Sequence, residues 1–397
     1  MSWQPKRLDQ LGAVSRGRSR HRPRDAAHLY GGPHPFIQTG DVKHAGLYIN
    51  DYTQTYSDAG LAQSKLWPVG TLCITIAANI ADTAILGIDA CFPDSVIGFT
   101  PDPHEADARF VKYLFDAIIK HRAQKFSQGA AQDNLSQEKL LSLEFDVPKV
   151  DEQKRIADVL AAYDDLIENN QRRMALLEES ARLLYSEWFV RLRFPGHEHT
   201  RITDGMPEGW ERKTLGDVAH INQTNLGSTY DGEIEYIDIA SVTPGAINET
   251  TPYDFRDAPS RARRVVCHGD IIWSCVRPNR RSHAVVWQPP ENLVASTGFA
   301  VITPISLPTS FLYQAVTTDL FVGYLENHAK GAAYPAVVAG DFERAKILVP
   351  SPVLSNAFNE FAEPLLTETH NLRVQNQKLR ATRDLLLPRL MSGELLA

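Results

Sequence analysis

Two arginine-rich segments contain the residues of this chain that are best suited to binding a charged partner. Residues 1–24 contain seven Lys or Arg and one acidic residue, and residues 261–283 contain six Arg and one acidic residue. Arg and Lys on loops can neutralise the phosphates of a nucleic acid, and an Arg or Asn that reaches a base edge can distinguish guanine or adenine. The segments therefore predict nucleic-acid contact, with solvated surface charge as the alternative for each segment taken alone.

The residues that we expect to contact DNA form three groups. The first group is Arg16, Arg18, Arg20 and Arg22, with Lys43 further along the chain. The second group is Arg261, Arg264, Arg277, Asn279, Arg280 and Arg281. The third group lies around a glycine-containing segment that occurs twice, with Lys125, Gln132 and Asn134 in one copy and Lys330 and Tyr334 in the other. A structural alternative for this third group is that Gly129 and Gly331 only permit a turn before the last strand.

No catalytic or metal-binding motif accompanies these clusters. The sequence contains no GxGxxG, GxxxxGK[ST], HExxH or GxSxG pattern. His197-Glu198-His199 follows Pro195-Gly196, which fits an exposed linker better than a metal site. The four cysteines include no CxxC pair and lie in apolar or strand-like stretches, which favours reduced thiols that pack as small hydrophobic groups. None of these residues therefore forms a convincing catalytic or metal-binding constellation.

Composition places the chain among ordinary globular proteins. It has 397 residues, of which 43% are hydrophobic and 22% charged, so we expect two to four domains. The net charge of −7 excludes a uniformly basic protein, but many of the acidic residues lie between Asp151 and Glu187, away from the arginine clusters. No stretch reaches the ~20 apolar residues of a membrane span, and residues 1–24 have no apolar signal core, so we expect a cytoplasmic location.

The chain repeats itself at an interval of about 200 residues. Gly129-Ala130-Ala131 returns as Gly331-Ala332-Ala333, and Phe145-Asp146-Val147-Pro148 returns as Ile347-Leu348-Val349-Pro350. Each half begins with roughly 150 residues of short apolar runs that Gly, Pro and Asp interrupt, which is typical of strands and turns, together with one helical pattern. The prediction is an α+β protein with two mixed α/β globules, at residues 1–150 and 194–352.

A different period follows each globule. Apolar residues alternate at steps of four and three through residues 151–193, and the stripe recurs with more polar members in residues 353–397. A 3.5-residue spacing sustained over this length predicts coiled-coil helices. Helices of ~55 Å are too long for one globule, so we expect them to pair antiparallel, although each could pack on its own globule instead. The predicted seam contains Ile156, Leu160, Tyr163, Ile167, Met174, Leu177, Leu184, Trp188, Leu365, Leu372, Leu379 and Leu386.

Two prolines fall inside the second helical stripe. Pro364 and Pro388 lie in the segment 353–397, where each removes one backbone donor from a helix. We therefore expect the second helix to fray or kink at these positions.

Several segments resemble the specificity (S) subunit of type I restriction-modification enzymes. These are Gly129-Ala130-Ala131-Gln132-Asp133-Asn134-Leu135-Ser136, then Val147-Pro148, then Glu152-Gln153-Lys154-Arg155-Ile156-Ala157 before a long helix, and finally residues 385–395, LLLPRLMSGEL. The resemblance implies that each globule is a target recognition domain that reads one half of a bipartite DNA sequence. The helices would set the gap and dock two modification subunits.

The resemblance also implies where the chemistry lies. S-adenosylmethionine, ATP and magnesium would be bound by modification and restriction subunits, and this subunit would have no active site. The second repeat departs from the family pattern, because Gln132 and Asn134 become Tyr334 and Ala336. Two alternatives remain: a coiled-coil adaptor that joins protein partners without sequence-specific DNA binding, and an S subunit that works in a modification-only complex.

Overall fold

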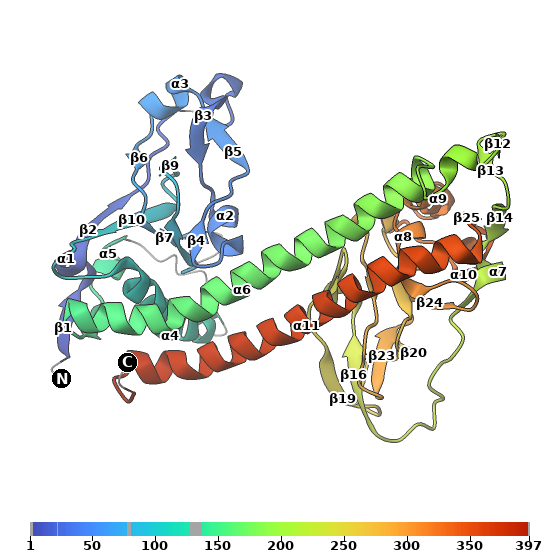
Figure 1. Cartoon of the computed structure of the whole chain (residues 1–397). Coiled ribbons are helices and arrows are strands. Elements are labelled where there is room, and N and C mark those ends of the chain that lie inside the picture. The colour runs from blue at the N-terminus through green and yellow to red at the C-terminus, as the bar shows by residue number, and fades with distance from the viewer. Residues whose placement is uncertain (1–2, 22, 78–80, 128–136, 396–397) are drawn as a thin grey trace. The chain divides into compact units, whose positions relative to one another are not determined.

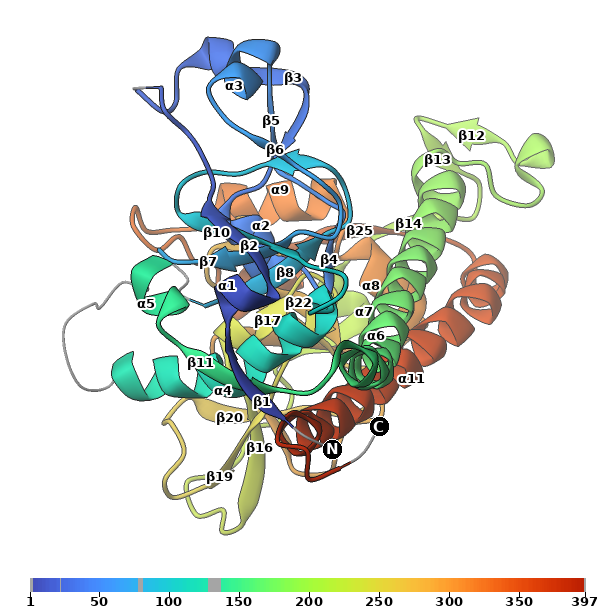
Figure 2. The same ribbon diagram turned by 90° about the vertical axis from the view of Figure 1, so that its left-hand side faces the viewer.

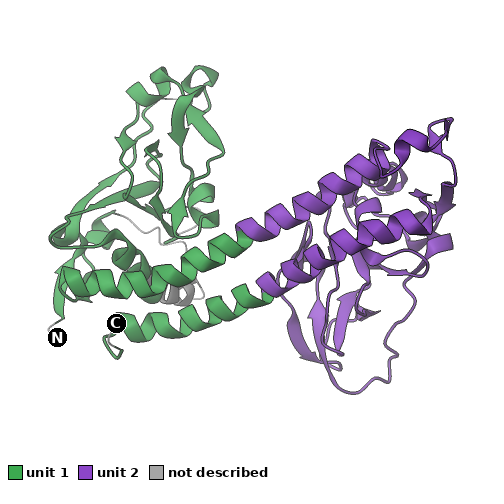
Figure 3. Ribbon diagram, viewed as in Figure 1, with its two compact units in different colours: residues 1–171, 374–397 green, residues 172–373 purple. Residues whose placement is uncertain are grey.

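The computed structural model describes residues 3–21, 23–77, 81–127 and 137–395. The chain combines helices and sheets (Figures 1 and 2), which confirms the predicted mixed fold. It divides into two compact units, shown in different colours in Figure 3. Unit 1 contains residues 1–171 and 374–397, and unit 2 contains residues 172–373.

Unit 1 contains three sheets, among the residues that the structure describes there. Their strand orders are β1-β11, β2-β10-β7-β8-β4 and β5-β3-β9-β6. The strands are β1 Gln4–Arg7, β2 Gly12–Arg16, β3 Tyr30–Phe36, β4 Tyr48–Ile49, β5 Gln54–Tyr56, β6 Leu66–Trp67, β7 Leu72–Thr75, β8 Thr83–Leu86, β9 Ala90–Cys91, β10 Val96–Pro101 and β11 Glu144–Val147. The helices that lie wholly in this unit are α1 Leu8–Leu11, η1 Ala27–Leu29, α2 Thr39–His44, α3 Asp58–Ala62, α4 Ala108–Ser127 and α5 Gln137–Leu141.

Unit 2 contains the corresponding orders β14-β25, β15-β24-β21-β22 and β19-β16-β23-β20, with two small hairpins in addition. The strands are β12 Ile202–Thr203, β13 Met206–Pro207, β14 Glu211–Thr214, β15 Ala219–Ile221, β16 Glu233–Ile237, β17 Val242–Thr243, β18 Ala246–Ile247, β19 Thr251–Asp254, β20 Ala262–Val265, β21 Ile271–Ser274, β22 His283–Val285, β23 Leu293–Ser296, β24 Phe299–Pro304 and β25 Lys346–Val349. The helices are η3 His197–His199, α7 Leu215–Val218, η4 Ile239–Ser241, η5 Pro278–Arg280, α8 Thr309–Ala315, α9 Asp319–His328 and α10 Ala339–Arg344.

Strand directions repeat between the units as well as strand orders. β3 pairs parallel to β9 in unit 1, and β16 pairs parallel to β23 in unit 2. The remaining shared pairings are antiparallel, including β7 with β10 and β21 with β24. The two units therefore have one topology in common, and equivalent loops can be compared by their place in it.

Two long helices contribute to both units. Helix α6 (Val150–Tyr185) continues as a π-helical turn, η2 (Ser186–Val190), and α11 runs over Pro352–Met391. In unit 1 they run antiparallel, since Asp164 of α6 pairs with Arg383 while Asn170, further along α6, bonds to Asn376, earlier on α11. Every predicted seam residue is buried or half-buried. By contrast, Leu176 of α6, which is not a predicted seam residue, is 68% exposed.

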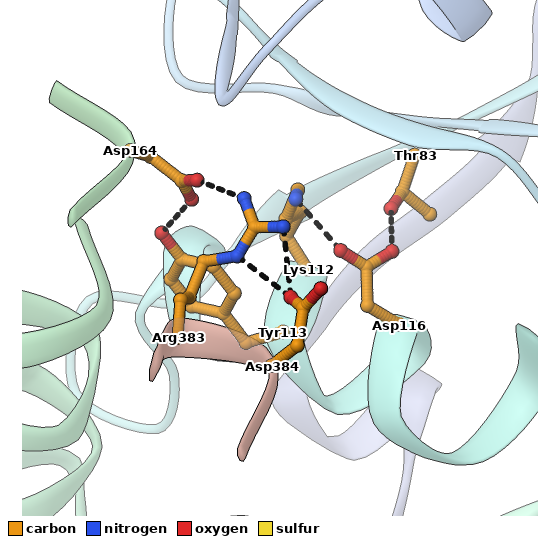
Figure 4. A network of polar contacts seen from close by, with 7 residues as sticks. All are labelled: Thr83, Lys112, Tyr113, Asp116, Asp164, Arg383 and Asp384. Carbon is orange, nitrogen blue, oxygen red and sulfur yellow. Dashed lines mark hydrogen bonds and ion pairs between the residues drawn. The ribbon is translucent and has the colours of Figure 1, made fainter. Parts of the chain in front are cut away.

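The seam of unit 1 also contains polar groups that satisfy one another. Asn170 Nδ2 donates to Asn376 Oδ1 at 2.9 Å, and Asn376 Nδ2 donates to the Ile167 carbonyl at 3.1 Å. Asp164 accepts a hydrogen bond from Tyr113 of α4 at 2.6 Å and pairs with Arg383 of α11 (Figure 4). These bonds join the two long helices to each other and to α4.

The prolines of α11 do not interrupt it. The helix continues through Pro364 and Pro388 to Met391, so the predicted fraying at these positions is wrong. Each proline removes one backbone hydrogen bond, and packing of the seam on both sides of it outweighs this loss. Gly393 then ends the helix with φ +73°, and a Cβ there would lie 2.8 Å from Nε1 of Trp3. Strand β1 and the end of α11 are neighbours in Figures 1 and 2.

The core of unit 1 requires the end of α11. Leu390 and Met391 are buried in the same cluster as Ile156 and Leu160 of α6 and Phe110 of α4. Unit 2 is completed in the same way, by Tyr185 of α6, Phe189 of η2 and Phe358 of α11. Each unit therefore buries apolar side chains from both long helices.

We predict that Leu390→Ala destabilises unit 1 by about 2–4 kcal/mol, because it leaves a cavity at a side chain that is 3% exposed. Leu385→Ala is the matched control, since Leu385 lies on the same helix and is 71% exposed. Its effect should stay within about 0.5 kcal/mol. Denaturant unfolding with hydrogen exchange resolved to each unit measures both. Equal effects of the two variants would contradict the proposed role of Leu390.

Candidate nucleic-acid interface

The arginine-rich turn of unit 2 has an unusual backbone. It follows strand β21 and is centred on η5, with Arg277 on one side at φ 51° and Arg281 on the other at φ 53°. Non-glycine residues rarely adopt this left-handed conformation, which costs on the order of 1–3 kcal/mol when contacts must impose it. The surrounding structure must therefore hold this turn in place.

Contacts from two other segments hold it. The Arg277 guanidinium lies 4.5 Å from the centre of the Tyr334 ring, and its Nη2 donates to the Ala333 carbonyl at 3.3 Å. The Arg277 backbone N–H donates to the Pro335 carbonyl at 2.7 Å. Arg281 pairs with Asp319 in the first turn of α9, and this bond lowers the pKa of the Asp319 carboxyl. The structure thus brings together the 277–281 turn and the 330–334 segment, which we predicted separately.

The apex of the turn is exposed, unlike the two arginines that flank it. Pro278 is buried, while Asn279 and Arg280 are exposed. Among the described residues, neither of these two side chains has a hydrogen bond or ion pair to another part of the protein. Lys330 is also exposed. It lies in the segment that contacts this turn, which is held by reciprocal 2.9 Å backbone bonds between Lys330 and Ala336.

Two predicted arginines, Arg261 directly before β20 and Arg264 within it, differ from each other. Arg261 is exposed, and its carbonyl accepts from Thr297 N–H at 2.8 Å. Arg264 is half-buried, its Nη1 donates to Asn225 Oδ1 at 2.8 Å, and burial lowers the pKa of its guanidinium. Arg261 therefore presents its charge to solvent, and Arg264 already has a protein partner.

The described arginines between residues 16 and 24 differ in whether their side chains contact Asp94. Arg16 Nε donates to the Asp94 carbonyl at 3.0 Å, and Arg24 makes two 2.8 Å bonds to the Asp94 carboxylate. Arg18 and Arg20 are exposed, and their backbone N–H groups are fixed by Phe92 O at 3.0 Å and Gln63 Oε1 at 2.6 Å. The second pair is thus anchored through its backbone and leaves its guanidinium groups at the surface.

Lys65 belongs with this surface, although the sequence did not indicate it. Its Nζ lies 3.5 Å from the centre of the Trp67 ring, and burial together with the charge of Arg18 lowers the pKa of the Lys65 ammonium. Lys65 stands alone in its sequence segment, so only the topology reveals that it neighbours Arg18.

Two further predicted contacts lie on helices of unit 1. Lys43 is exposed in the last turn of α2, and Lys125 lies near the end of α4. Arg22, Gln132 and Asn134 lie outside the described residues. Within the described ranges no group of three or more His, Cys, Asp or Glu side chains could hold a metal ion. No helix in those ranges is both long and apolar enough to cross a membrane.

Comparison with known proteins relates the first part of the chain, which includes the arginine surface of unit 1, to a family. Residues 1–179 match the family model described as the type I restriction modification DNA specificity domain. These residues belong to the type I DNA specificity family. The match confirms the resemblance predicted from the sequence, and the specificity domain includes the Arg16–Arg20 surface and the first part of α6.

Two curated relatives match over nearly the whole of this chain. The type I restriction enzyme MjaIX specificity subunit of Methanocaldococcus jannaschii is 23% identical, over 99% of this chain and 93% of its own length. The HindI specificity subunit of Haemophilus influenzae is 21% identical, over 91% of this chain and 94% of its own. The crystal structure of an S subunit from M. genitalium covers 98% of this chain and 96% of its own, with a TM-score of 0.59 and 18% identity. It has the same fold.

The buried His283 supplies a prediction on pH. It lies directly after the arginine turn, with Nδ1 3.2 Å from the Tyr313 hydroxyl. Burial, and secondarily the charge of Arg281, lowers the pKa of His283 from 6.5 to about 4. Between these values the unfolded chain binds more protons, so stability is full above pH 6.5 and falls as the pH drops toward 4.

We predict that His283→Gln removes a loss on the order of 3 kcal/mol between pH 7 and pH 4, at 1.36 kcal/mol per pKa unit. The comparison is between variant and parent, because other groups also titrate in this range. Denaturant unfolding of unit 2 at several pH values measures the difference. His220→Gln, at an exposed histidine of the same unit, is the control. An unchanged pH dependence in His283→Gln would refute the assignment.

Proposed function

We propose that this chain is the non-catalytic DNA-sequence specificity subunit of a type I restriction-modification complex, and that each unit reads one half of a bipartite target. The observation that carries the proposal is one shared topology with two different basic surfaces, in a chain whose residues 1–179 match a DNA specificity domain. Surfaces that differ on the same framework are what two unequal half-sites require.

The partners follow from the same proposal. The long helices α6 and α11 contribute to both units, which supports a role in setting the gap between half-sites and in docking two modification subunits. Those subunits would supply S-adenosylmethionine binding and adenine methylation, and restriction subunits would supply ATP- and magnesium-dependent translocation and cleavage. The specificity chain itself would bind no cofactor.

Mapping methylated adenines in genomic DNA tests the function directly. We predict one bipartite motif that is methylated in cells with the gene, absent after its deletion and restored by a plasmid copy. A methylation pattern that does not depend on the gene would refute the proposal and favour the adaptor alternative. In cells where the motif depends on the gene, reduced transformation by unmethylated plasmid DNA would distinguish a restriction complex from a modification-only complex.

Exchange of one unit tests whether the two units read DNA independently. Replacing residues 200–350 by those of a relative with a different target should change one half of the methylated motif and leave the other half and the gap unchanged. Methylated-adenine mapping again gives the result. A change in both halves would contradict independent reading.

Charge removal tests the surface of unit 1. Arg18→Ala should weaken binding to a duplex that contains the mapped motif and reduce the slope of log K against log salt by about 1 for each lost phosphate contact. Arg7→Ala is the control, since Arg7 is an exposed arginine of the same unit that pairs with Asp9. Equal slopes for Arg18→Ala and the parent would place the DNA elsewhere on unit 1.

A further inference from the structure

The arginine turn of unit 2 contains two kinds of polar side chain, and the difference assigns them separate tasks. We propose that Asn279 and Arg280 read base edges in the major groove of one half-site, while Arg277 and Arg281 hold the turn in the required shape. This assignment rests on the proposed function and deepens it, because it separates base-reading residues from positioning residues.

The positioning residues are directed toward the protein. Arg277 is committed to the Tyr334 ring and the Ala333 carbonyl, and Arg281 is committed to Asp319. Both have a left-handed backbone, so the protein contacts of their side chains coincide with the two strained points of the turn. Loss of either contact would release a strained residue and let the apex move.

The apex carries the two residue types that form the most specific base contacts. Asn can bond adenine at N6 and N7 together, and Arg can bond guanine at O6 and N7 together. Asn279 and Arg280 are adjacent and exposed on a short turn whose base is fixed by backbone bonds from Arg280 N–H to Arg277 O and from Arg281 N–H to Pro278 O, both at 2.9 Å. A rigid turn lowers the entropy cost of placing these side chains against the DNA, and it increases the discrimination between correct and incorrect base pairs.

Unit 1 has one left-handed residue at the corresponding place. The equivalent loop follows β7, and there Ala81 has φ 66°, at the place in the topology where Arg281 has φ 53°. That loop contains no arginine in residues 76–82, whose sequence is IAANIAD. The two loops share this left-handed position, and each has an Asn two residues before it, Asn79 and Asn279. Ile80 and Ala81 replace Arg280 and Arg281, and this difference in sequence matches the requirement that the two half-sites differ.

The first test replaces each apex residue and maps methylated adenines in cells that carry the variant. Asn279→Ala should make one position of one half-site degenerate, and Arg280→Lys, which keeps the charge but loses the two-pronged contact, should do so at another position. The other half-site and the gap should stay unchanged. With matched duplexes, the preference of the purified chain for the correct base pair should fall from roughly 10- to 100-fold to near one.

The second test separates positioning from simple electrostatics. Removing the acidic Asp319 should strengthen DNA binding at every sequence if only its charge matters. If Asp319 positions the turn through Arg281, Asp319→Ala should instead broaden the motif at the positions that Asn279 and Arg280 read. Asp231→Ala is the matched control, since Asp231 is an exposed residue of the same unit that pairs with Arg256 at 2.8 Å.

The outcomes distinguish the two levels of the proposal. Absence of a gene-dependent bipartite motif in the parent strain overturns the proposed function itself. A normal motif in the parent with an unchanged motif in both apex variants overturns the base-reading assignment alone. Complete loss of methylation by a folded, normally abundant Asn279→Ala variant also overturns it, since a base reader should relax the sequence and leave methylation in place.

Discussion

The packing of α6 against α11 is the interaction on which the rest of the molecule depends. Each unit contains a stretch of both helices, and in each unit the seam continues directly into the globular core. Unit 1 is assembled from the first 171 residues and the segment 374–397, so its core closes only when the distant end of the chain has folded against it. The long helices are therefore part of each recognition unit as well as the link between them.

Buried polar groups give this packing its specificity. An apolar seam of Leu and Ile tolerates a shift along the helices, whereas the Asn170 to Asn376 bond is satisfied in one alignment only. Asp164 adds a second restriction, because it must meet Arg383 and Tyr113 at the same time. Leaving either carboxylate or guanidinium unpaired in this partly buried site would be costly, so misaligned pairings are disfavoured.

The sequence revealed features that repeat along the chain and missed those that depend on topology. The 3.5-residue period identified the seam because many residues contribute to it, and it persisted through Pro364 and Pro388, where a local rule predicted failure. The arginine clusters could be found by counting charged residues along the sequence. Their partners were not, because Asp94 and Asp319 are far from them in sequence and reach them only through the fold.

For the same reason, the distinction between Arg281 and Arg280 cannot be made from composition, since the two residues are identical neighbours. Backbone conformation separates them: one lies at a left-handed position and contacts α9, and the other lies at the apex. Lys65 could not be recognised from composition for a different reason. It has no residue of like charge beside it in the sequence, and the fold alone brings it close to Arg18. Residues 128–136, which carried much of the family resemblance, lie outside the described residues.

The contact between Trp3 and Gly393 brings the two ends of the described chain together, which the linear sequence does not show. Since β1 begins beside the end of α11, the path of globule, helix, globule, helix returns to the part of unit 1 in which it started. The order in which the two recognition units are encoded is then physically arbitrary. A gene that joined residues 3 and 395 through a short linker and opened the chain between α6 and β14 would keep the described contacts within each unit.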